Sequence, residues 1–221
     1  MEEDVIMNKT ALARDIIATC LRMGKMGLNQ GTAGNVSVRY HTGMLITPTG
    51  IPYEHLIERH IVFVDADGRT DSGKIPSSEW RFHQAVYRIR PDCHAVVHNH
   101  AVYSTAVSIL NRPIPAIHYM IAAAGGDDVP CAPYATFGSR DLAAHVALAM
   151  RNRRATLLQH HGLVTCGENL ARALWLAQEV EILARLYLTI LPVIDPVPVL
   201  SGQEMARVLE KFQTYGLRVD G

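Results

Sequence analysis

One short stretch, AVVHNH at 95–100, constrains this chain more than any other. The β-branched residues Val96 and Val97 favour a buried strand. Residues two apart on a strand point to the same face, so His98 and His100 should project their imidazoles side by side, roughly 6–7 Å apart at the backbone. Two imidazoles at that separation can bind one divalent ion, and histidine is a common ligand of zinc. The alternative is a pair of histidines that only make hydrogen bonds in the core or on the surface.

The composition is that of an ordinary globular protein. Of the 221 residues, 48% are hydrophobic and 19% are charged, and the formal net charge is zero. A neutral balance of this kind argues against a nucleic-acid partner. The chain is long enough for one α/β domain with a sizeable core, and no repeat or linker divides it. We therefore expect a single domain over residues 1–221, with 1–7 as a short N-terminal extension and about 214–221 as a tail.

Cysteine usage and the ends of the chain predict a location. The four cysteines are widely spaced and contain no Cys-x-x-Cys pair, which predicts neither a disulfide framework nor a zinc ribbon and fits a reducing compartment. Residues 1–4 are acidic and lack the basic-then-apolar pattern of a secretion signal. Charged side chains interrupt the most apolar region, 170–191, so it does not read as a membrane span. We expect a cytoplasmic protein with no membrane partner.

Three segments upstream of the histidine stretch could bind an anion. Residues 29–39 and 47–50 form glycine-bearing loops that expose backbone N–H groups beside short polar side chains, which suits a phosphate, although for either loop alone a hairpin turn is the favoured explanation. Ser77 or Ser78 is the expected N-cap of a following helix, with Glu79 in its first turn. A helix N-terminus is also a favourable place for a phosphate.

A third metal ligand is expected from a second predicted strand, 156–165, which contains His160 and His161. Adjacent strand residues face opposite ways, so only one of the two can join the first histidine pair, and spacing does not choose between them. His94 points to the correct face but lies about 13 Å along the strand, too far to share the ion. Glu79 is the candidate acid or fourth ligand.

Five motifs in order resemble the zinc-dependent class II aldolase and ribulose-phosphate epimerase family. They are 31–37 (GTAGNVS), 47–50 (TPTG), 77–79 (SSE), 98–100 (HNH) and 160–162 (HHG). Each motif is weak alone, but all five together over about residues 8–216 are specific. The resemblance implies an α/β fold, a three-layer α/β/α sandwich around a mostly antiparallel central sheet. It also implies a homotetramer with active sites at the subunit interfaces.

The resemblance further implies roles for individual residues. One Zn²⁺ per subunit would be held by His98, His100 and His161. Glu79 would be the acid–base group, and Tyr119 would donate a proton to the aldehyde oxygen in a neighbouring subunit's site.

The remaining implied roles concern the substrate. Its phosphate would be bound by Asn35, Thr49, Gly50, Ser77 and Ser78. Tyr215, in the tail, would help to cover the site.

The implied activity is reversible aldol cleavage of a small phosphorylated ketose, L-fuculose 1-phosphate, to dihydroxyacetone phosphate and L-lactaldehyde through a zinc-stabilised enediolate. Such a reaction needs an electron sink. A Schiff-base enzyme uses a desolvated lysine, whereas the four lysines here lie at predicted helix ends and in loops. A metal Lewis acid can supply the same stabilisation.

Three alternatives remain open at this level. L-Ribulose-5-phosphate 4-epimerase shares the metal site and the enediolate, but the extra proton donors expected near its metal are not identifiable here. A cupin-like dioxygenase also has a His-x-His pattern, but the long helical stripes oppose an all-β fold. An interaction module that has lost the chemistry need not keep metal ligands.

Overall fold

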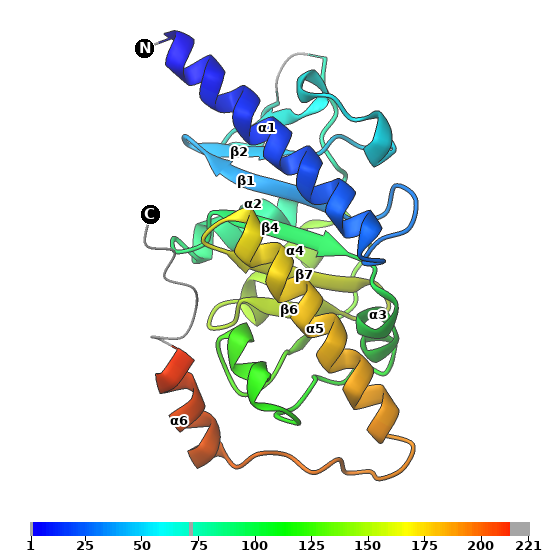
Figure 1. Cartoon of the computed structure of the whole chain (residues 1–221). Coiled ribbons are helices and arrows are strands. Elements are labelled where there is room, and N and C mark those ends of the chain that lie inside the picture. Colours follow the sequence, from blue (N-terminus) through cyan, green and yellow to red (C-terminus); the bar gives the residue numbers. More distant parts are fainter. Residues whose placement is uncertain (1, 71–72, 213–221) are drawn as a thin grey trace.

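The computed structural model describes residues 2–70 and 73–212 (Figure 1). The expected tail at 214–221, with Tyr215, lies outside these residues. The elements run in the order α1 (Glu2–Lys25), β1 (Asn35–Tyr40), β2 (Gly43–Ile46), η1 (Tyr53–His55), η2 (Glu58–His60), β3 (Val62–Val64), α2 (Trp80–Ile89), β4 (Ala95–Asn99), α3 (Val102–Ile109), η3 (Tyr119–Ala124), β5 (Cys131–Ala132), α4 (Arg140–Ala149), β6 (Ala155–Leu158), β7 (Gly162–Gly167), α5 (Leu170–Ile190) and α6 (Gly202–Phe212). The backbone is helical from Glu2, so α1 already includes most of the stretch expected to be an extension at 1–7.

The strands form one sheet in the order β3-β2-β1-β4-β7-β6-β5. Five neighbouring pairs are antiparallel, and β5 pairs with β6 in parallel. The expected α/β fold is confirmed, but the expectation of a mostly antiparallel sheet needs a correction, because the sheet is mixed. The parallel strand is the two-residue β5, which is too short to show a periodic pattern in the sequence.

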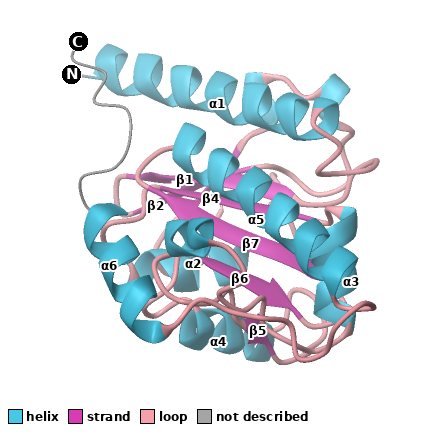
Figure 2. Ribbon diagram, turned by 60° about the horizontal axis from the view of Figure 1, so that its bottom comes forward, coloured by secondary structure: helices cyan, strands magenta, loops and turns pink. Residues whose placement is uncertain are grey.

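Apolar side chains cover both faces of the sheet. On one face Val97 of β4 packs in a core with Ile16 of α1 and Val180 of α5. On the other face its neighbour Val96 packs in a second core with Phe82 of α2 and Val146 of α4. Figure 1 shows α1 and α5 across the near face, and Figure 2 shows α4 on the side of the sheet away from α1. This alternation holds β4 rigidly between helices, and β4 carries the first histidine of the pair.

Polar side-chain caps fix the starts of three helices. The side chains of Ser139 and Asn169 accept hydrogen bonds from the first turns of α4 and α5. Ser201 Oγ accepts one from Glu204 N–H in α6. Such caps satisfy backbone donors that the helix itself leaves unpaired. Among the described helices, none combines the length and the apolar character that a membrane crossing needs.

Cys93 and Cys166 form a disulfide, with Cα atoms 5.9 Å apart. The cysteine spacing predicted no disulfide framework, and it gave no indication of this single pair. The two residues are separated by 73 positions in sequence, and the antiparallel pairing of β4 with β7 brings them together. Because this proximity is produced by tertiary structure, the spacing of the cysteines could not reveal it. The bond links the two segments that lead to the site histidines.

Candidate active site

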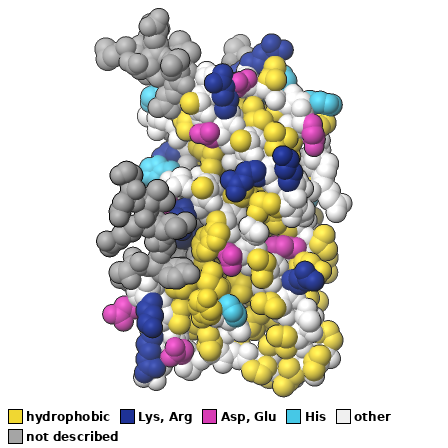
Figure 3. All heavy atoms as spheres, viewed as in Figure 1, with side chains coloured by type: hydrophobic (Ala, Val, Ile, Leu, Met, Phe, Trp, Pro, Cys, Tyr) yellow, Lys and Arg dark blue, Asp and Glu magenta, His cyan; other side chains and the backbone are white. Residues whose placement is uncertain are grey.

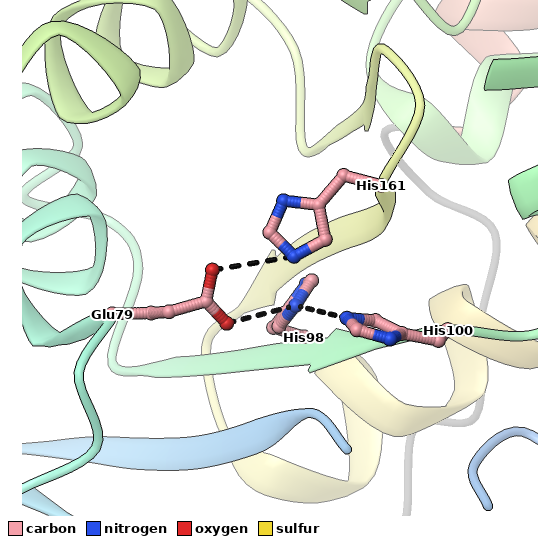
Figure 4. A group of neighbouring side chains, drawn as sticks. All are labelled: Glu79, His98, His100 and His161. Carbon is pink, nitrogen blue, oxygen red and sulfur yellow. Dashed lines mark hydrogen bonds and ion pairs between the residues drawn. The ribbon is translucent and has the colours of Figure 1, made fainter. Parts of the chain in front are cut away.

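Four side chains converge at one end of the central strands. Glu79, His98, His100 and His161 each offer a ligand atom, and these atoms lie within 4.8 Å of one another (Figure 4). His98 Nε2 is 3.0 Å from His100 Nε2 and 3.1 Å from Glu79 Oε2. His161 Nε2 is 3.3 Å from Glu79 Oε1. The structure thus brings the three predicted histidines and the predicted acid into one cluster.

Local structure explains why His98 and His100 meet. His98 is the next-to-last residue of β4. His100 follows directly after the strand, two positions on, so both side chains point to the same face. His98 Nδ1 lies 2.9 Å from the carbonyl oxygen of Leu163 in β7. A carbonyl oxygen only accepts, so Nδ1 carries a proton, and Nε2 is the nitrogen that faces the cluster.

His161 reaches the cluster from a turn. The expected single strand at 156–165 was wrong, since β6 ends at Leu158 and β7 begins at Gly162. His160 has a left-handed backbone with φ of 54° and an exposed side chain, and His161 follows it toward the cluster. A Cβ at Gly162 would collide with the carbonyl oxygen of Asn99, so only glycine fits after the histidine pair.

Glu79 is placed by the start of α2. It occupies the N-cap position with φ of −98°, and Ser77 Oγ accepts a hydrogen bond of 3.3 Å from its N–H. The expectation that Ser77 or Ser78 would be the N-cap, with Glu79 inside the first turn, was therefore wrong by one or two positions. The difference matters, because a residue outside the helical turn can direct its carboxylate toward the histidines (Figure 4).

The electrostatics favour a cation at the cluster. Burial alone would raise the pKa of Glu79, but His98, His161 and the Asn35 amide together hold that pKa well below its usual range. Burial, reinforced by His98, lowers the pKa of His100 to about 4 and that of His161 to about 3. At neutral pH His100 and His161 are therefore neutral and Glu79 is ionised, so these three side chains are electron-pair donors.

One orphaned atom tests whether a metal fits. Glu79 Oε1 is buried and has no hydrogen-bond partner among the described residues. An unpaired buried carboxylate oxygen is costly, and a divalent ion held by the three imidazoles would put a positive charge beside it. The donor set, three imidazole nitrogens with a carboxylate next to them, is one that zinc accepts.

The cluster forms part of the wall of a cavity of about 340 Å³. The residues expected to bind phosphate line the same cavity: Asn35, Thr49, Gly50, Ser77 and Ser78. Among the described lining residues there is no lysine or arginine. Gly50 has φ of 70°, a left-handed conformation that favours glycine.

Two residues expected at the site do not line this cavity in the described part of the chain. Tyr119 begins η3, and 47% of its surface is exposed. Tyr215 lies outside the described residues. His94, which the sequence excludes as a ligand, lies beside a different cavity together with Arg22 and Arg39.

Other lining residues were missed at the level of sequence. Tyr134 and Phe137 also border the cavity, as does His160, which the sequence offered only as an alternative metal ligand. Tyr134 and Phe137 belong to the loop that follows β5, and both are exposed. The sequence did contain a signal for these residues, since both aromatic side chains lie in a loop bounded by Pro133 and Gly138. Proteins seldom expose several large apolar side chains together without a function.

Comparison with known proteins agrees with this arrangement. The family model described as the class II aldolase and adducin N-terminal domain matches residues 14–188. The chain is 72% identical to an L-fuculose phosphate aldolase of Escherichia coli O6:H1, over 97% of this chain and 100% of that protein. It is 54% identical to a 5-methylthioribulose-1-phosphate/5-deoxyribulose-1-phosphate aldolase of Escherichia coli O45:K1, over 96% of this chain and 100% of that protein. A solved structure of an L-fuculose 1-phosphate aldolase superposes with a TM-score of 0.89 at 38% identity, covering 92% of this chain and 97% of the other. The chain belongs to the class II aldolase and adducin N-terminal domain family.

Proposed function

We propose that the chain is a metal-dependent class II aldolase that cleaves L-fuculose 1-phosphate reversibly to dihydroxyacetone phosphate and L-lactaldehyde. The observation that carries this proposal is the convergence of three imidazoles on Glu79 in the wall of a cavity. The full-length identity of 72% with an L-fuculose phosphate aldolase supports the choice of substrate.

The metal is zinc in this proposal, one per subunit, held by His98, His100 and His161. Three nitrogen ligands leave coordination positions open for a substrate. Bound there, the ion supplies Lewis-acid stabilisation for the negative charge that develops beside the substrate carbonyl. Burial favours the uncharged, metal-binding form of His100 and His161, which fits this role.

Glu79 moves the proton at the hydroxymethyl carbon of the dihydroxyacetone phosphate part. Its Oε2 is held by the Asn35 amide at 3.0 Å, while Oε1 makes no hydrogen bond to a described residue. An oxygen with an unengaged lone pair is suited to accept and return a proton. The carboxylate is ionised at neutral pH, which is the form a base requires.

The phosphate is held without a cationic side chain. Ser77, Ser78, Thr49 and Gly50 lie around the same cavity as Glu79 and supply hydroxyl and backbone N–H groups close to the start of α2. Asn35 completes this wall. Binding the phosphate at a fixed distance from the histidines orients the reacting carbons, which accounts for a large part of the rate in reactions of this type.

Tyr119 protonates the aldehyde oxygen in the site of a neighbouring subunit, and Tyr215 covers that site, in a homotetramer. The exposed position of Tyr119 supports a role outside its own cavity. Exposed apolar side chains on α3 and α5 also support an assembly: Val102, Ile109, Leu110, Ile182, Leu186 and Ile190. Figure 3 shows apolar surface in the area where these helices lie.

The wider architecture in this proposal is one domain over residues 1–221, built as a three-layer α/β/α sandwich. The two apolar cores on opposite faces of the sheet support the layers. The proposal includes a cytoplasmic location.

A direct assay tests the function. Zinc-loaded protein is given L-fuculose 1-phosphate, L-ribulose 5-phosphate or 5-deoxyribulose 1-phosphate in separate reactions, and products are identified by NMR. We expect release of L-lactaldehyde from L-fuculose 1-phosphate with the highest kcat/KM of the three. Formation of a C4 epimer from L-ribulose 5-phosphate would identify an epimerase instead, and preferred cleavage of 5-deoxyribulose 1-phosphate would contradict the proposed substrate.

A further inference from the structure

A chain of buried hydrogen bonds ends on Glu79. Tyr87 Oη lies 2.8 Å from Ser37 Oγ, Ser37 Oγ lies 2.7 Å from His83 Nδ1, His83 Nε2 lies 2.5 Å from Asn35 Oδ1, and Asn35 Nδ2 lies 3.0 Å from Glu79 Oε2. All five side chains are buried, and His83 is completely so. Buried polar groups this well paired form rigid networks that fix side-chain positions.

The elements explain why this chain forms. Asn35 and Ser37 are two apart on β1 and therefore share a face of the sheet. His83 and Tyr87 are four apart on α2 and therefore share a side of the helix. The helix covers that face of the sheet, so a strand pair and a helix pair interlock directly behind the cluster.

The direction of each hydrogen bond follows from the carboxylate. An ionised carboxylate only accepts, so Asn35 donates through Nδ2 and its Oδ1 is left as an acceptor. Oδ1 therefore accepts from His83 Nε2–H, and the unprotonated Nδ1 of His83 accepts from the Ser37 hydroxyl. The Tyr87 hydroxyl then donates to Ser37 Oγ. Every donor in the chain points toward Glu79.

His83 is the residue that enforces this direction. Only a neutral imidazole donates at one nitrogen and accepts at the other, and burial lowers the pKa of His83 to about 3. Without the Nε2–H donor the amide of Asn35 could turn over and present its oxygen to the carboxylate. That arrangement would repel Glu79 and leave its position undetermined.

We infer that His83 is a positioning residue for the aldol reaction: through Asn35 it holds Glu79 Oε2 and leaves Oε1 as the oxygen that exchanges the proton. This inference rests on the proposed function, because it assigns His83 a part in the proton transfer made by Glu79. Among the described contacts, His83 forms no hydrogen bond with a metal ligand, and it does not line the cavity. Its effect on the reaction is therefore indirect.

The test measures the proton transfer alone. Zinc-loaded protein in D₂O exchanges the hydroxymethyl proton of dihydroxyacetone phosphate, a reaction that requires Glu79 but no aldehyde. The exchange rate per bound zinc, the KM and the primary deuterium isotope effect are measured for the wild type and for His83→Leu, His83→Gln and Ser37→Ala. Thr165→Val serves as a matched control, because Thr165 is fully buried in the same sheet and its hydroxyl bonds only to backbone carbonyls of Val97 and Ala173.

We expect His83→Leu to slow exchange by ~10- to 100-fold per bound zinc, the range typical for residues that orient ligands and catalytic groups from behind. KM should stay near the wild-type value, and the isotope effect should rise because proton transfer becomes slower than the other steps. His83→Gln should recover most of the rate, since its amide N–H can reach Asn35. Ser37→Ala removes little volume and should give an intermediate loss of exchange rate. This variant tests the inference even if His83→Leu does not fold.

The outcomes separate this inference from the proposed function. If the wild type exchanges normally and His83→Leu and Ser37→Ala lose rate only in proportion to their zinc-loaded fraction, with an unchanged isotope effect as in Thr165→Val, the inference is overturned. If the wild type itself does not exchange this proton, the proposed function fails and the inference fails with it.

Discussion

His98 Nδ1 donates a hydrogen bond to the carbonyl oxygen of Leu163, at 2.9 Å. This bond between β4 and β7 places a proton on Nδ1 and fixes the orientation of the imidazole before any metal binds, as backbone carbonyls commonly do for histidine ligands. Its Nε2 consequently faces His100 and Glu79. The candidate site is thus organised around an electron-pair donor set that the β4–β7 pairing holds in place.

Substitutions in the β6–β7 turn distinguish the assigned zinc ligand, His161, from its neighbour His160. His161→Ala should lower zinc affinity by at least ~10-fold, because it removes one of the three nitrogen donors. His160→Ala is the matched control: its side chain is exposed and lies outside the cluster, so zinc affinity should remain at the wild-type value. Competition with a zinc chelator measures both constants. Equal losses in the two variants would contradict the assignment of His161.

Glu79→Gln should bind zinc but turn over slowly. The three histidines remain, so the metal content should match the wild type, whereas loss of the base should lower kcat by ~10²- to 10⁴-fold. Metal analysis and cleavage of L-fuculose 1-phosphate on the same preparation check both parts. A variant with full zinc and unchanged kcat would remove Glu79 from the proton transfer.

Tyr119→Phe should impair the step that involves the aldehyde. The substitution removes only the hydroxyl of a half-exposed side chain, so folding and phosphate affinity should be unchanged. We expect a ~10²-fold or greater loss in cleavage, while exchange of the dihydroxyacetone phosphate proton continues. Tyr103→Phe, on the surface of α3, is the control. Loss of both reactions to the same extent would argue against a role specific to the aldehyde.

The metal-free protein should lose stability as the solution becomes acidic. Burial lowers the pKa of His100 to about 4 and that of His161 to about 3, whereas the unfolded chain titrates near the ordinary value of 6.5. Below that value the unfolded state binds protons that the folded state does not, so the free energy of unfolding should fall as the pH drops from about 6.5 to about 4. Urea unfolding at a series of pH values measures this.

Two comparisons give that pH series a control. His161→Ala removes one of the titrating groups, so its stability should depend less steeply on pH over the same interval. The pKa of Glu79 is lowered, so this carboxylate contributes a loss of the same sign, but only at more acidic pH. A free energy of unfolding that stays constant between pH 6.5 and 4 would contradict the burial of neutral histidines in the folded state.

Strand periodicity was sufficient to predict the first half of the site. The β-branched residues Val96 and Val97 predicted β4, and the structure confirms that strand at Ala95–Asn99 with every residue buried. The same two-residue period placed His98 and His100 together. Caps at Ser139, Asn169 and Ser201 were also predictable, because each is a local side-chain-to-backbone bond.

The choice between His160 and His161 was not predictable from parity. Parity applies only within a strand, and these residues form the turn between β6 and β7. A left-handed φ at His160, which is uncommon for a residue other than glycine, sets which imidazole turns inward. The family resemblance, rather than local periodicity, pointed to His161.

Long-range register accounts for what the sequence could not reveal. Asn35 and His98 are partners between β1 and β4, which brings a loop-edge amide beside the histidine cluster. The Cys93–Cys166 disulfide likewise depends on the pairing of β4 with β7. Neither register can be read from spacing, because the residues involved are more than sixty positions apart and nothing local links them.

The most direct test is to titrate the metal-free protein with zinc while following cleavage of L-fuculose 1-phosphate. We predict that the metal-free protein is inactive and that activity rises linearly to a plateau at one zinc per chain. Activity in the metal-free protein equal to that of the loaded protein, or no response to zinc, would contradict it.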